Sequence, residues 1–148
     1  MTLVENIIRV LHFLVGAGWV GYVLFMTTVV LPLAAKGSLN AGPLESMKGK
    51  LTVFSRASSV LMLLTGGYLA WVGYSVDEFA STMAGNLVLG MVVLWLVFTA
   101  LIEVGGQKLS SGLRNKKVRE PAYNSIMWYR AASIVGILLL IDGALLMG

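Results

Sequence analysis

His12 is the only histidine of the chain, and it lies in an apolar stretch that carries no further charged residue before Lys36. Arg9 precedes it by about one helical turn, and Trp19 follows seven residues later, so a helix would present the three side chains on one face. An imidazole just inside an apolar segment is a ligand that haem iron or a copper ion can bind. We therefore expect a cofactor or metal position at His12.

The ligand inventory favours haem over copper at this position. With no cysteine and one histidine, the chain cannot build a thiolate site or a multi-histidine site by itself. A tight copper site needs several soft or imidazole donors, and the eight methionines are scattered along the sequence. Haem b needs only one protein nitrogen and an apolar slot. The sequence alone leaves three alternatives: haem b, copper and no cofactor at all. Of the two cofactors, haem b fits better than copper.

Several polar side chains fall at the same predicted depth as His12, near one membrane surface. Arg9, Tyr68 and Asp142 belong to this outer level, and ionisable groups at such depth usually have a partner. One interpretation is an Arg9–Asp142 ion pair with His12 hydrogen-bonded beside it. A second is a cofactor site in which His12 is the ligand, oriented by Asp142 or a backbone carbonyl, with Arg9, Trp19 and Tyr68 around it. A proton relay is the third.

Another charged group falls near the opposite membrane surface. Glu103 lies close to the end of one apolar stretch, where Arg56 or Arg130 of a neighbouring helix could reach it. We expect a structural ion pair that fixes the register of the helices, with a gate or substrate contact as the alternative.

The composition predicts the elements that position these residues. The chain is 57% hydrophobic and 12% charged, about half the charge of an average soluble domain. A bilayer-spanning helix needs about 20 apolar residues. The sequence satisfies this four times, which predicts helices at about 7–31, 54–73, 81–105 and 124–147, with the first closed by Pro32 and a linker over 36–50. We expect one all-α domain over residues 1–148: an integral membrane four-helix bundle of two antiparallel hairpins.

The basic residues predict how this bundle is oriented. All of them except Arg9 lie in or beside the two loops that join the first helix to the second and the third to the fourth. Cytoplasmic loops of membrane proteins carry such an excess of lysine and arginine. We therefore expect both termini outside, the basic loops in the cytoplasm, a multi-pass location in the plasma membrane of a prokaryote, lipid as the main partner and no nucleic-acid partner.

Parts of the first two helices resemble a known family. His12 followed by Gly18-Trp19-Val20-Gly21, Phe25 and Pro32, and then Phe54-Ser55-Arg56 with Thr65-Gly66, resembles the copper-resistance protein D superfamily of four-helix membrane proteins. That superfamily includes haem-binding protoporphyrinogen oxidases, and the resemblance implies His12 as a haem ligand. The oxidase branch carries an aromatic-proline-arginine signature at the end of the first helix. Leu31-Pro32-Leu33 does not match it.

The sequence leaves two main functions open, and a small-solute transporter ranks last because few polar residues line any one helix face. The first is a membrane protein that handles haem or copper through His12, with a redox role open. The alternative is a non-catalytic accessory subunit that packs into a larger respiratory or oxygenase complex, or a homo-oligomer. No pattern of nucleophilic catalysis or phosphate binding occurs, so we do not expect an enzyme.

Overall fold

The computed structural model describes residues 2–148, and within them all regular structure is helical. The elements in chain order are α1 (Leu3–Phe25), η1 (Met26–Val30), α2 (Leu31–Ala35), α3 (Ala41–Gly73), α4 (Glu78–Ser81), α5 (Met83–Leu113) and α6 (Arg119–Met147). Because α1, η1 and α2 form one continuous rod, the molecule has four long helices, each long and apolar enough to cross a membrane. The prediction of an all-α bundle of four long apolar helices, each able to span a membrane, is confirmed.

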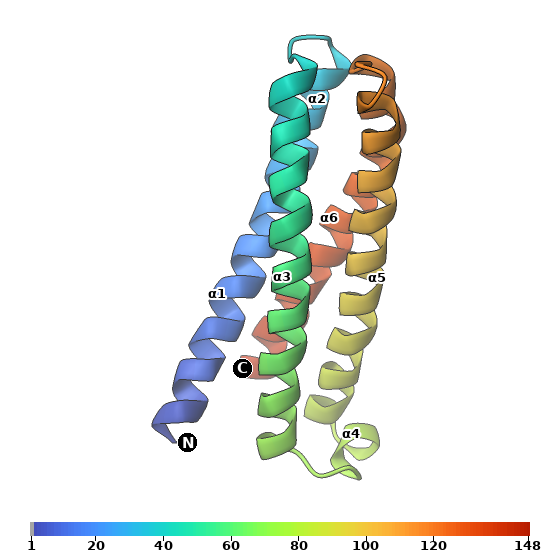
Figure 1. Ribbon diagram of the computed structural model, residues 1–148. Helices are drawn as coiled ribbons and strands as arrows, with labels where there is room; N and C mark the ends of the chain where they lie inside the picture. Colours follow the sequence, from blue (N-terminus) through green and yellow to red (C-terminus); the bar gives the residue numbers. More distant parts are fainter. Residues whose placement is uncertain (1) are drawn as a thin grey trace.

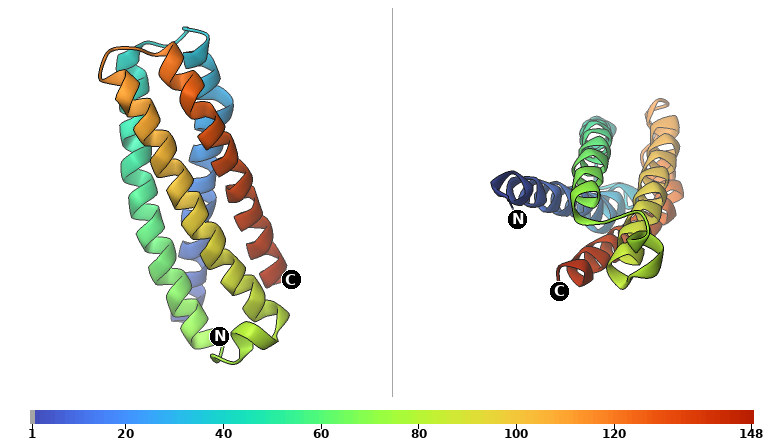
Figure 2. Two further views of the ribbon diagram at one scale, coloured as in Figure 1. Left: turned by 90° about the vertical axis from the view of Figure 1, so that its right-hand side faces the viewer. Right: turned by 90° about the horizontal axis from the view of Figure 1, so that it is seen from below.

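The four rods run antiparallel in sequence order, so alternate connections lie at opposite ends (Figure 1). The α2–α3 and α5–α6 loops, which carry most of the basic residues, share one end, here called the basic end. Both termini and α4 lie at the other, the terminal end. The most extensive packing joins α5 to α6, and α1 packs mainly on α3 (Figure 2). The fold thus consists of two helix pairs, α1 with α3 and α5 with α6, that pack against each other.

The hydrophobic core is concentrated toward the basic end. Its fully buried side chains include Trp19, Met26 and Leu31 from the first rod, Leu51 from α3 and Phe98 from α5. Toward the terminal end α1 diverges from α6, as the left view of Figure 2 shows. Large apolar side chains of the first turns of α1 are exposed there. His12 therefore lies where the bundle is more open than in its core.

The first helix does not end at Pro32 as the sequence predicts, but continues to Ala35 through the wider turn of η1. Proline has no N–H and its ring collides with the carbonyl four residues earlier in a regular helix. In η1 the bonding shifts by one residue, so that the Leu31 N–H reaches the Met26 carbonyl. The hydroxyls of Thr27 and Thr28 bond carbonyls four residues before them, at 2.8 and 2.6 Å. These contacts satisfy carbonyls in the distorted region, and the rod passes the proline.

The linker predicted over 36–50 is also shorter than expected, because α3 begins at Ala41 rather than near Phe54. Gly42 and Pro43, which lie in this predicted linker and are typical of turns, fall in the first turn of α3, where a missing N–H costs no helical bond. The turn itself is made at Gly37, whose φ of +77° disfavours residues with a Cβ. α3, α5 and α6 all extend beyond the predicted spans at the basic end.

Candidate functional site

The local sequence of α1 directs His12 toward α3. The helix starts at a capping box, in which the Thr2 hydroxyl accepts from the Glu5 N–H and the Glu5 carboxylate accepts from the Thr2 N–H. From this start, Gly16, Trp19 and the residues after them form the buried face of α1. His12 lies one turn before Gly16 on that face, and its side chain is half-buried between α1 and α3.

A short hydrogen bond fixes the imidazole of His12. Its Nδ1 lies 2.7 Å from the Oγ1 of Thr65 on α3, and the same Oγ1 lies 2.6 Å from the carbonyl oxygen of Leu61. A carbonyl can only accept, so the single hydroxyl hydrogen of Thr65 is directed to Leu61. Thr65 must then accept from His12, which places the imidazole proton on Nδ1. In the neutral ring Nε2 consequently keeps its lone pair and is free to bind a ligand.

Two glycines let α1 and α3 approach closely around this bond. A Cβ added to Gly66 would lie 3.0 Å from Cε1 of His12, and one added to Gly16 would lie 3.0 Å from Cε of Met62. Both distances are tighter than ordinary van der Waals contact, so the side chains occupy space that the glycines leave. Gly66 thus seats the imidazole ring against the backbone of α3, next to the threonine that orients it.

The other residues expected around His12 are not gathered into one cluster. Arg9 is exposed and forms no ion pair within residues 2–148, and Tyr68 is partly exposed. Trp19 is 1% exposed and lies in the core, about 10 Å along the helix from His12 by the rise per residue. It packs edge-on against Phe98 with ring centroids 4.6 Å apart. The structure therefore brings Thr65 and Gly66, not these three, to the histidine.

Asp142 is buried elsewhere at the terminal end, between α6 and α5. Its side chain is 8% exposed, and its Oδ2 is enclosed without any hydrogen-bond partner. No ion pair joins it to Arg9 among the described residues, so the geometry expected for an Arg9–Asp142 pair is not present. The closest approach is to Gly90, where an added Cβ would lie 3.3 Å from Oδ2.

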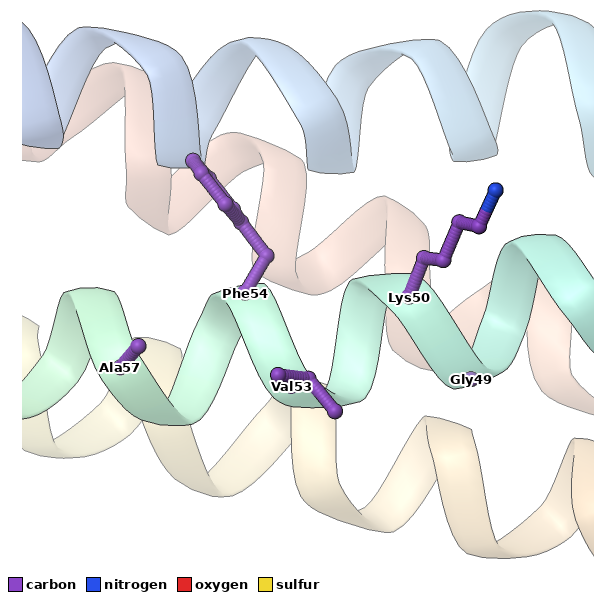
Figure 3. Close-up of a pocket in the computed structure, with 5 residues that line it drawn as sticks. All are labelled: Gly49, Lys50, Val53, Phe54 and Ala57. Atoms are coloured by element: carbon purple, nitrogen blue, oxygen red, sulfur yellow. The ribbon is translucent and has the colours of Figure 1, made fainter.

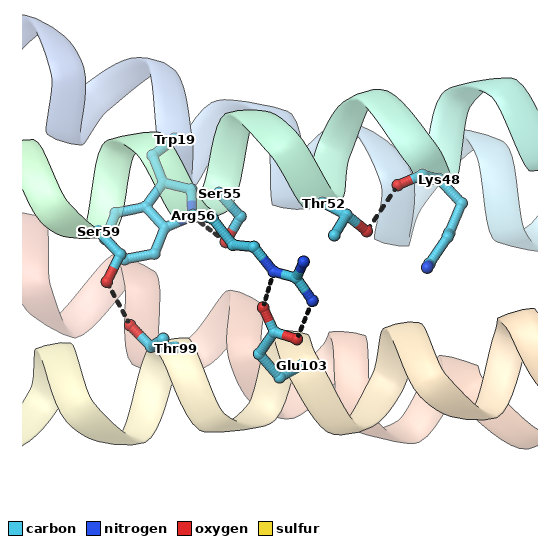
Figure 4. A network of polar contacts seen from close by, with 8 residues as sticks. All are labelled: Trp19, Lys48, Thr52, Ser55, Arg56, Ser59, Thr99 and Glu103. Atoms are coloured by element: carbon cyan, nitrogen blue, oxygen red, sulfur yellow. Dashed lines mark hydrogen bonds and ion pairs between the residues drawn. The ribbon is translucent and has the colours of Figure 1, made fainter.

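At mid-bundle, toward the basic end, Arg56 of α3 and Glu103 of α5 form a two-pronged ion pair (Figure 4). The Nε and Nη2 of the arginine lie 3.0 and 3.2 Å from the two carboxylate oxygens. Such a fork fixes direction as well as distance, so it sets the register of α3 against α5. Arg130, the other expected partner, is exposed and takes no part in an ion pair within residues 2–148.

Hydrogen bonds beside this ion pair tie α3 to its neighbours, and sequence reasoning missed most of them. The indole N–H of Trp19 donates to Ser55 at 2.9 Å, and that of Trp95 donates to the Ser59 carbonyl at 3.1 Å. The hydroxyls of Ser59 and Thr99 lie 3.4 Å apart (Figure 4). The recurrence of serines at helical spacing on α3 was the available signal. Small polar residues on one helix face are typical of contacts between membrane helices.

Two shallow grooves lie elsewhere on the bundle, away from His12. One shallow groove follows a face of α3 and is lined by Gly49, Lys50, Val53, Phe54 and Ala57 (Figure 3). A second lies between α1 and α3 and includes Tyr22 and Met47. Both are nearer the basic end than the histidine and are almost wholly apolar, and neither gathers groups that could do chemistry.

Comparisons with known proteins add no assignment: no protein-family model, no curated protein and no solved structure matches this chain. The likeness to the copper-resistance protein D superfamily stays a prediction from the residues quoted above.

Proposed function

We propose that this chain is a four-span membrane protein that binds haem b, with Nε2 of His12 as the ligand to the iron. The observation that carries the proposal is the hydrogen-bond chain from His12 through Thr65 to the Leu61 carbonyl. It holds the imidazole in one tautomer, with the lone pair on Nε2, the ring nitrogen that makes no hydrogen bond within residues 2–148. Ligating histidines characteristically donate their second ring nitrogen to such an acceptor, which fixes the orientation of the ring.

The donor set of the chain fits haem better than a bare metal ion. A single histidine with no cysteine supplies one strong ligand, and haem iron can be held by one protein nitrogen because the porphyrin supplies four more. Within residues 2–148 no three histidine, cysteine, aspartate or glutamate side chains lie together as an ion site would require. Bound haem would supply one-electron redox chemistry.

The residues of the chain would have separate roles in holding the cofactor. His12 would bind the iron, Thr65 would keep its ring oriented, and Gly66 would leave room for the ring beside α3. Arg9 lies about one turn nearer the terminal end and is exposed, so it is available to a haem propionate at the membrane surface. The apolar side chains exposed on the first turns of α1 suit contact with a porphyrin as well as with lipid.

Spectroscopy of the purified protein tests this proposal. We expect the protein, purified in mild detergent or titrated with haem, to show a Soret band that His12→Ala abolishes. Thr28→Val is a suitable control because Thr28 makes the same backbone hydrogen bond as Thr65 but does not contact the histidine. A protein that stays colourless and binds no added haem would refute the proposal. If it then co-purified with large membrane partners, the accessory-subunit hypothesis would gain support.

The orientation proposed with this function places the basic end in the cytoplasm of a prokaryotic cell and both termini outside. Because the chain has no cysteine, single cysteines can report on each side. Ser75→Cys near α4 should react with an impermeant maleimide in intact cells, and Asn115→Cys in the α5–α6 loop only after permeabilisation. The reverse pattern would overturn the orientation.

A further inference from the structure

One oxygen of the Asp142 carboxyl group, Oδ2, is enclosed at the interface of α5 and α6. The residue is 8% exposed, and this oxygen has no hydrogen-bond partner. The space it occupies exists because residue 90 is glycine, since an added Cβ would lie 3.3 Å from Oδ2. An aspartate oxygen is therefore directed at a part of the neighbouring helix that has no side chain to donate a hydrogen bond.

No element packed against α6 supplies a counter-charge to this group. On α5 the residues from Met83 to Ile102 carry no charge, and η1 and α2 carry none. On α6 the nearest basic residue is Arg130, about 18 Å away by the helical rise.

The cations on α1 do not reach Asp142 either. Arg9 is exposed and makes no ion pair within the described part of the chain. His12 directs its Nδ1 proton to Thr65 on α3. Glu5, the remaining charged residue of α1, is acidic and closes the capping box.

An ionised carboxylate in this place would lose hydration without gaining a donor. Burying a charge without a partner is among the most costly changes in a membrane or a protein interior, whereas a neutral carboxylic acid loses far less. We propose that Asp142 is a proton-binding site of the bundle: its carboxylate takes up a proton from water at the terminal end and is held as the acid against Gly90. No metal or other cation is needed for this site, and the proposal does not depend on cofactor binding at His12.

Protonation and the packing of α5 on α6 are coupled in this arrangement. The acid form allows Oδ2 to stay enclosed, and release of the proton would leave a negative charge on a carboxylate whose Oδ2 has no hydrogen-bond donor. Water could then reach Oδ2 only if the terminal ends of the two helices moved apart. Asp142 therefore couples the pH at the terminal end to the packing of α5 against α6.

Isotope labelling gives a direct test, because the chain has only two aspartates, Asp77 and Asp142. Asp77 is exposed in the turn before α4 and serves as the internal reference. The whole protein, carrying ¹³C at the aspartate side-chain carboxyls, is reconstituted in lipid vesicles and measured by NMR across a pH series. Asp77→Asn leaves a single aspartate and assigns the two signals.

At neutral pH we expect the Asp142 signal at the position of a carboxylic acid and the Asp77 signal at that of a carboxylate. An Asp142 signal that is a carboxylate at neutral pH, or that titrates together with Asp77, would overturn the proposal. The readout needs neither haem nor any substitution at Asp142, so loss of the haem proposal would leave it standing.

Discussion

Replacing Thr65 by valine removes the acceptor that orients His12 while keeping the size and branching of the side chain. In the native bundle the Nδ1–H tautomer makes a hydrogen bond of 2.7 Å. The Nε2–H tautomer would instead set the Nδ1 lone pair against a hydroxyl oxygen whose hydrogen is already directed to Leu61. A hydrogen bond of this kind contributes about 0.5–1.5 kcal/mol net, so its upper end corresponds to roughly a tenfold preference between the tautomers.

The assay follows from the single histidine. ¹⁵N-histidine labelling gives the spectrum of His12 alone, and the protonated and unprotonated ring nitrogens of a neutral imidazole have well-separated shifts. We expect the Nδ1–H form to dominate in the native protein and the Nε2–H form to appear in Thr65→Val. If haem binds at His12, its affinity should fall about 10-fold or more in this variant, the usual effect of losing a group that orients a ligand.

A matched control separates orientation from a general effect of losing a hydroxyl. Thr28→Val also removes a threonine hydroxyl bonded to the carbonyl four residues earlier, at 2.6 Å, but far from the histidine. It should leave the tautomer unchanged. A native protein with the proton on Nε2, or a Thr65→Val spectrum identical to the native one, would refute the reasoning.

Three further tests address the packing of the helices, at the histidine, in the core and at the ion pair. Gly66→Ala should displace the imidazole, since the new Cβ would lie 3.0 Å from its Cε1. We expect this variant to lower the free energy of unfolding by about 1–3 kcal/mol in a detergent unfolding titration. Gly67→Ala, where nothing lies within 4 Å of the new Cβ, should leave the free energy of unfolding unchanged. Gly136→Ala should lower the free energy of unfolding by a similar amount, because its Cβ would lie 2.9 Å from the buried ring of Phe98. A free energy of unfolding equal to that of Gly67→Ala would contradict this, since it would mean that the core rearranges without loss of stability. Arg56→Glu and Glu103→Arg should each lower the melting temperature, and combining them should restore part of that loss. If the double variant melts no higher than the less stable single variant, the ion pair does not set the register of the helices.

The architecture could be predicted from the sequence because it depends on composition and periodicity. Four long apolar stretches, with basic residues collected in alternate loops, allow few arrangements other than a bundle of four antiparallel helices. His12 could be selected as the candidate ligand by the same kind of argument, since a lone ionisable ring in an apolar helix is unusual. Where local signals were ambiguous the prediction was wrong. Pro32 and the Gly42-Pro43 pair are helix breakers in general. The wide turn of η1 accommodates Pro32, and the first turn of α3 accommodates Gly42 and Pro43.

Which side chains meet was decided only by the tertiary structure. The sequence offered two arginines for Glu103, and the approach of α3 to α5 selects Arg56. It offered Arg9 for Asp142, yet α1 diverges from α6 at the terminal end (Figure 2) and no ion pair joins the two residues. The packing of α6 on α5 encloses Oδ2 of Asp142 against Gly90 instead. Thr65 acquires its role only because Gly66 allows α3 close enough to the histidine. Periodicity determines the face on which a residue lies, but helix spacing and crossing, which set the partner across the interface, depend on how all four helices pack together.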